Sequence, residues 1–143
     1  EQIIGIMSAI YQESKWDPKA ANSKSTARGI VQWMCSKTSG CRQKGICVYI
    51  NGKYGTKYQP VRKGDINDRV NFIDMPLKYQ VEGLINELNS IFKHKLSNLK
   101  SCKTAVTACD SWTKYIEGAH PDDAHRKWIK NSRNEYNLAF GNS

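Results

Sequence analysis

The spacing of apolar residues along the chain predicts mainly helical structure. Residues 2–13 carry apolar side chains every three or four positions, which is the period of one helix face. Other segments repeat this period or carry helix-start signals, and we expect helices there: 66–74, 77–92, 101–116 and 121–140. Ser101 is the expected cap of segment 101–116, whose inward face is expected to carry Ala105, Ala108, Cys109, Trp112 and Ile116. The fold class predicted from this pattern is mainly α.

Two segments interrupt the helical pattern. Residues 15–29 are polar and rich in turn-forming residues, so we expect a loop. Residues 35–64 hold three cysteines, and Asn51-Gly52 stands there between β-prone residues, which is a strong hairpin signal. We therefore predict a helical bundle of the α+β kind with a small β-hairpin inserted around residues 46–59.

The length and composition fit one soluble globular domain. The chain has 143 residues, enough to bury a core, and 39% of them are hydrophobic. No apolar run approaches the roughly 20 residues that a membrane span needs. The first residues lack the features of a signal peptide and open directly into helical pattern. We expect a single monomeric domain over residues 1–143, either excised from a longer protein or already processed.

The net charge of +9 favours an anionic partner. Nucleic acid, an anionic membrane and an anionic cell wall are the candidates, and a merely solvated basic surface is the alternative. A nucleic-acid-binding helical domain would use the lysines of residues 93–103. Basic residues are spread along the whole chain, however, and no recognised nucleic-acid motif appears, so we expect no nucleic acid partner.

The five cysteines leave at least one unpaired within the chain. Cys35, Cys41 and Cys47 have five residues between neighbours, which is not a metal-binding spacing. Both one local disulfide and a set of reduced thiols remain open for these three. Cys102 and Cys109 lie seven residues apart, about 10 Å along a helix axis, so within one helix they cannot bond to each other. We expect them to be core packing residues.

The three histidines form no ligand pattern with nearby acidic residues. His120 and His125 flank Pro121-Asp122-Asp123, where we expect surface residues at a helix start. The sequence therefore predicts neither a metal site nor a cofactor.

Glu13 is the first candidate for chemistry. It stands at the edge of the apolar stripe, at the end of the first predicted helix. Partial desolvation favours the protonated form of a carboxyl group, which is the form that a general acid needs. The alternative is an ordinary glutamate at a helix end, paired with Lys15 or Lys19 or simply solvated.

The surroundings of Glu13 resemble a known pattern. Glu13-Ser14 is followed by Asp17-Pro18-x-Ala20 and then by Ala-Arg-Gly-Ile-Val-Gln-Trp over residues 27–33. This opening resembles that of the lysozyme-like superfamily, which soluble lytic transglycosylases and phage tail lysozymes share. Residues 76–88 and 112–121 look like later segments of the phage tail lysozymes, and the Gln-Trp pair also favours that family. Residues 35–64 do not map onto the family pattern.

The resemblance implies that the substrate is bacterial peptidoglycan. The bond cleaved would be the β-1,4 link from N-acetylmuramic acid to N-acetylglucosamine, with Glu13 as the general acid. Action would be extracellular or virion-associated, and the basic surface would suit anionic wall polymers as a further partner.

The resemblance also implies roles for other residues, whose positions match the family's motifs. Gln32 would bind an acetamido group or orient a water, and Ser14 would cap the helix end or hold the cleft geometry. Trp33 would offer a stacking face to a sugar ring or serve as a core aromatic. Tyr115 and Glu117 would line the far wall of the site.

Three functions remain open. A muramidase needs a second carboxylate, for which Asp17, Asp65, Asp68 and Glu117 are the candidates. A lytic transglycosylase needs none, because the N-acetyl group of the substrate attacks and an anhydro-sugar results. A non-catalytic wall-binding module would leave Glu13 solvated.

Overall fold

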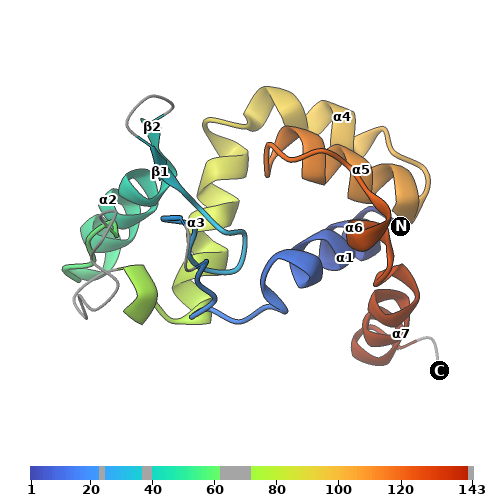
Figure 1. Cartoon of the computed structure of the whole chain (residues 1–143), viewed down its shortest axis with the longest axis horizontal. Helices are drawn as coiled ribbons and strands as arrows, with labels where there is room; N and C mark the ends of the chain where they lie inside the picture. Colours follow the sequence, from blue (N-terminus) through green and yellow to red (C-terminus); the bar gives the residue numbers. More distant parts are fainter. Residues whose placement is uncertain (23–24, 37–39, 62–71, 142–143) are drawn as a thin grey trace. The chain divides into compact units, whose positions relative to one another are not determined.

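The computed structural model is mainly α-helical, which confirms the predicted fold class (Figure 1). It describes residues 1–22, 25–36, 40–61 and 72–141. The chain forms two compact units. The terminal unit comprises Glu1–Glu13 and Phe92–Ser143, and the central unit comprises Ser14–Ile91. No helix among the described residues is long and apolar enough to span a membrane.

The terminal unit is built from short helices around a small core. In chain order these are α1 (Gln2–Ser14), the 3-10 turn η2 (Lys93–Lys95), α4 (Leu96–Lys100), α5 (Ala105–Tyr115), α6 (Asp123–Arg126) and α7 (Ile129–Ala139). Helix α1 approaches α5 closely at Gly5, where a Cβ atom would lie 2.4 Å from the carbonyl oxygen of Ala105. Ile4, Ala9 and Ile10 of α1 are buried, whereas Ile3 is 52% exposed.

The N-cap of helix α5 lies three residues later than predicted. Thr104, not Ser101, is its N-cap, because the Thr104 and Thr107 side chains each bond to the other's backbone N–H in a capping box. The predicted inward face is confirmed, since Ala105, Ala108 and Trp112 are buried.

The last predicted helix is divided into α6 and α7. Asp122 caps α6 by accepting a hydrogen bond from the backbone N–H of His125 at 3.0 Å. Trp128 has a non-helical backbone and precedes α7. The continuous helical pattern of the sequence does not show this break.

The described residues of the central unit form two helices and a very short strand pair. Strands β1 (Cys35–Ser36) and β2 (Gly40–Cys41) pair antiparallel and lead into α2 (Arg42–Tyr54), followed by the 3-10 turn η1 (Phe72–Asp74) and α3 (Leu77–Asn89). Helices α2 and α3 pack at Gly83, where a Cβ atom would meet the Ile46 side chain at 2.8 Å. Of the helix predicted at 66–74, residues 66–71 lie outside the described residues.

The predicted hairpin around residues 46–59 is wrong. Most of that segment belongs to α2, with Asn51-Gly52 inside the helix and Gly55 as its left-handed C-cap. The buried residues of α2 are Gln43, Ile46, Cys47 and Ile50, which follow the helical period. Burial of this face against α3 therefore outweighs the local turn signal of Asn-Gly.

A disulfide joins Cys35 to Cys41 across the strand pair, so a local disulfide is the correct alternative. Cys47, Cys102 and Cys109 carry free thiols, in agreement with the prediction that the last two do not bond to each other. Cys109 packs in the core as expected, whereas Cys102 is only partly buried.

Candidate active site

Glu13 stands in the last turn of α1. Its side chain is 25% exposed, so solvent and ligands can reach it. The helix ends directly after it, because Lys15 and Trp16 have positive φ angles of 53° and 61°. The next residue after Glu13, Ser14, belongs to the central unit, where its hydroxyl donates a hydrogen bond to the carbonyl oxygen of Ile30 at 2.6 Å.

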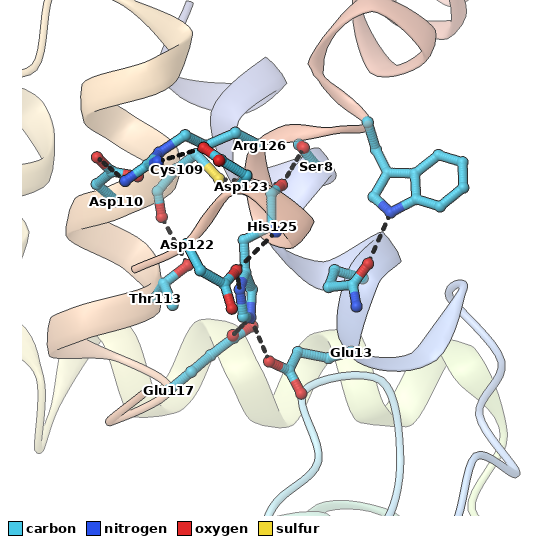
Figure 2. Close-up of polar contacts among 12 residues, drawn as sticks. Ser8, Glu13, Cys109, Asp110, Thr113, Glu117, Asp122, Asp123, His125 and Arg126 are labelled. Carbon is cyan, nitrogen blue, oxygen red and sulfur yellow. Dashed lines mark hydrogen bonds and ion pairs between the residues drawn. The ribbon is translucent and has the colours of Figure 1, made fainter. Parts of the chain in front are cut away.

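A buried imidazole holds the Glu13 carboxylate. The His125 side chain is 9% exposed, and its Nε2 lies 2.6 Å from Oε1 of Glu13 (Figure 2). The other ring nitrogen, Nδ1, lies 2.5 Å from Oδ1 of Asp122, the N-cap of α6. The ring therefore bridges two carboxylates and has one orientation.

The backbone carbonyl group of His125 is also hydrogen-bonded. Its carbonyl oxygen accepts a hydrogen bond from the Ser8 hydroxyl of α1 at 2.5 Å. The same oxygen accepts a weaker bond from the Cys109 thiol of α5 at 3.3 Å. Contacts from α1, α5 and the α6 cap together fix His125 beside Glu13.

Glu117 brings another carboxylate to the same point. It follows α5, and its side chain is only 3% exposed. Its Oε1 accepts a hydrogen bond from Nε1 of Trp112 at 3.0 Å, while its Oε2 lies 3.8 Å from Nε2 of His125. One ligand atom from each of Glu13, Glu117 and His125 lies within 4.8 Å of the others, and Figure 2 shows the three side chains converging.

The electrostatics favour a protonated imidazole. Burial lowers the pKa of His125, but the hydrogen bonds to Glu13 and Asp122 outweigh it, so the pKa is raised overall. The hydrogen bond from His125 in turn lowers the pKa of Asp122. In the protonated form of the ring, both N–H groups donate, one to each carboxylate.

Arg126 ties α6 to α5 next to this cluster. Its Nε and Nη2 donate to the two carboxylate oxygens of Asp110 at 2.8 and 3.2 Å, and its Nη1 donates to Asp123 at 2.8 Å. The Asp110 contact thus anchors the short helix that carries His125 to α5, while the Asp123 contact lies within α6.

The structure brings two of the predicted site residues together, namely Glu13 and Glu117. Tyr115 is half-buried at the end of α5 in the same terminal unit. Ser14, Gln32 and Trp33 belong to the central unit.

Gln32 and Trp33 have structural roles within the central unit. Gln32 has a positive φ of 53°, and its side-chain amide donates to the carbonyl oxygens of Ala20 and Gly29 at 3.2 and 2.8 Å. Trp33 is 0% exposed and donates from Nε1 to Glu87 at 2.7 Å. Trp33 is therefore the core aromatic of the two alternatives, because a buried ring offers no stacking face.

Sequence reasoning missed His125 and Asp122. The prediction that His125 is a surface residue is wrong, since the residue is 7% exposed. Its partner Glu13 is 112 residues away, so no local pattern connects them. The available signal was Asp122, a capping residue three positions before His125.

Comparison with known proteins supplies the family. A search of curated proteins and a search of solved structures each gave no match. The model of the family described as phage tail lysozyme matches residues 1–138, nearly the whole chain. This confirms the resemblance seen around Glu13 and in the later segments. The chain belongs to the phage tail lysozyme family, and it is a peptidoglycan-degrading, glycosidase-like enzyme that acts on the bacterial cell wall.

Proposed function

We propose that the protein cleaves the β-1,4 bond between N-acetylmuramic acid and N-acetylglucosamine as a single lysozyme-like domain, with Glu13 as the general acid. The observation that carries this proposal is the placement of a partly exposed Glu13 at a helix end, held by a buried His125. Glycoside cleavage needs a carboxyl group that protonates the leaving oxygen, and this group must have a fixed position.

The neighbouring residues support this role by orientation. His125 donates a hydrogen bond to Oε1 of Glu13, and Asp122 fixes the ring that donates it. In the proposed reaction the Glu13 proton passes to the glycosidic oxygen while the bond from that oxygen to the anomeric carbon breaks. In hydrolysis a water oxygen then bonds to the anomeric carbon, and a water proton returns to the carboxylate. His125 and Asp122 act in this scheme as positioning residues.

Glu117 does not fit the role of the second carboxylate that contacts the substrate. An inverting enzyme needs carboxyl groups about 6.5–9.5 Å apart to admit a water, and a retaining enzyme needs a second carboxylate about 5–5.5 Å away that is open to the anomeric carbon. Glu13 and Glu117 have oxygens within 4.8 Å, and the Glu117 side chain is 3% exposed. We propose that Glu117 contributes a buried carboxylate beside Glu13 and His125. In a muramidase reaction, another residue would then be the catalytic base.

Lytic transglycosylation is the second candidate function, and the burial of Glu117 supports it by removing one of the four candidate second carboxylates. Of the other three, Asp65 and Asp68 lie outside the described residues. In that reaction a nucleophile from the substrate itself replaces water at the anomeric carbon, and an anhydro-muramic product results. No second carboxylate is needed. Both reactions use Glu13 in the same way.

The test is mass spectrometry of the muropeptides released from purified peptidoglycan. Wild type should release fragments, and Glu13→Gln should slow their release by at least about a hundredfold, the lower limit for a general acid. Glu135→Gln is the matched control, because Glu135 is exposed on α7 and should be dispensable. Reducing-end products identify a muramidase and anhydro products a transglycosylase. Release of fragments by Glu13→Gln at the wild-type rate would refute the proposal.

A further inference from the structure

We propose that Glu13, Glu117 and His125 form a binding site for a divalent transition-metal ion of the Zn²⁺ type. The three side chains come from the end of α1, from the segment after α5 and from α6. One ligand atom of each lies within 4.8 Å of the others. This binding does not depend on the proposed function.

The distances suit a small dication. Zn²⁺ binds nitrogen and oxygen ligands at about 2.0–2.2 Å, which places tetrahedral ligand atoms about 3.4 Å apart. Nε2 of His125 lies 2.6 Å from Oε1 of Glu13 and 3.8 Å from Oε2 of Glu117, so these separations bracket the required value. Small rotations of the two carboxylates suffice to admit the ion.

The imidazole is oriented in the way that metal-binding histidines usually are. A histidine ligand commonly donates its second ring N–H to a carboxylate, which fixes the tautomer and the direction of the coordinating nitrogen. Asp122 accepts that hydrogen bond from Nδ1 of His125 at 2.5 Å, and Nε2 is thereby aimed at the two glutamates (Figure 2). This is the observation that separates the cluster from a mere group of acidic residues.

The donor set and the charge select the class of ion. One imidazole nitrogen with carboxylate oxygens suits Zn²⁺ and similar transition metals, whereas Ca²⁺ and Mg²⁺ prefer oxygen alone. The carboxylates of Glu13, Glu117 and Asp122 surround a single imidazole, so a dication offsets negative charge. On binding, the proton on Nε2 leaves to solvent and its electron pair goes to the metal, while both glutamates bind as carboxylates.

Metal binding has a consequence for the wall-cleaving reaction, and this consequence alone rests on the proposed function. A metal-bound Glu13 has no proton to give. Zn²⁺ should therefore inhibit cleavage, and a chelator should restore it.

The test is calorimetric titration of Zn²⁺ into the full chain carrying Cys102→Ser, which removes the partly exposed free thiol as a competing ligand. One ion should bind per chain, and Co²⁺ in its place should give the visible absorption of a four-coordinate nitrogen and oxygen site. His125→Gln should weaken binding by at least about tenfold, and Asp122→Asn by about 10–100-fold. His120→Gln is the matched control, because His120 is exposed five residues away and should bind as the parent does.

Two results would overturn the proposal: no binding of one ion per chain, or binding that neither His125→Gln nor Asp122→Asn weakens. Circular dichroism checks that each variant folds. Asp122→Asn decides the matter if His125→Gln does not fold, because the Asp122 side chain is 52% exposed and asparagine also caps helices well. Binding is measured without peptidoglycan, so a failure of the proposed function leaves this result unaffected.

Discussion

Adding a single methyl group at Gly5 should destabilise the terminal unit. Gly5 lies where α1 meets α5, and a Cβ atom there would be 2.4 Å from the carbonyl oxygen of Ala105 and 2.7 Å from the backbone nitrogen of Cys109. Both are backbone atoms of a helix, so neither can rotate away as a flexible side chain does. The two helices would have to separate by about 1 Å to restore ordinary van der Waals contact at about 3.5 Å.

The magnitude follows from two opposing effects. Alanine is a better helix former than glycine by about 1 kcal/mol, which alone would stabilise α1. Overpacking of a close contact costs about 1–3 kcal/mol and occasionally more. Because the clash involves backbone on both sides, we expect the upper part of that range and a net loss of about 1–2 kcal/mol for Gly5→Ala. For a chain of this size the melting temperature should fall by about 3–6 °C.

Gly52→Ala is the matched control. Gly52 also lies within a helix, α2, but a Cβ atom there would meet nothing within 4 Å. The propensity gain should then appear alone, as a stabilisation of about 0.5–1 kcal/mol. Urea unfolding followed by far-ultraviolet circular dichroism measures both variants. Equal shifts of the unfolding midpoint in the same direction would refute the close helix contact.

Two further predictions concern the close packing at Gly29 and the burial of two free thiols. Gly29→Ala should lower the free energy of unfolding, measured by urea titration, by about 3 kcal/mol. Gly29 has a φ of +81°, and a Cβ atom there would lie 2.7 Å from Oε1 of Gln80. An unchanged unfolding midpoint would contradict this prediction. At pH 8 an aromatic disulfide reagent should modify Cys102 rapidly, whereas Cys47 and Cys109 should react only after unfolding. Burial raises the pKa of these two thiols to about 12 and about 11, so they stay protonated in the native state at that pH. Three rapidly reacting thiols would contradict this burial.

The spacing of apolar residues was sufficient to predict a helix where one face of that helix is buried in the core. The helix near residues 77–92 and the inward face of α5 were predicted, because apolar residues at helical spacing record burial directly. The hairpin around residues 46–59 was not, because the Asn51-Gly52 signal is local, whereas the packing of α2 against α3 is tertiary and stronger. Periodicity reports that a segment buries a face, but it does not say what lies against that face.

The candidate site also has a part that the sequence predicted and a part that it did not. Glu13 was found through its position at the end of an apolar helix and through the motif that follows it. Its contact with His125 was not predictable, because the interaction joins residues 112 positions apart and no local pattern around His125 points to Glu13. Trp33 carried two possible roles in the sequence, and only its complete burial distinguished them.

The division of the chain into two units has a consequence for how the protein folds during synthesis. The central unit is one continuous stretch, Ser14–Ile91, and can fold as soon as it leaves the ribosome. The terminal unit needs Glu1–Glu13 together with Phe92–Ser143, so α1 is synthesised before the helices that it packs against. Closing so large a loop is entropically slow unless the intervening chain is already compact. Glu13 therefore meets His125 only after residues 92–125 have been synthesised, so the carboxylate cluster is assembled later than the central unit.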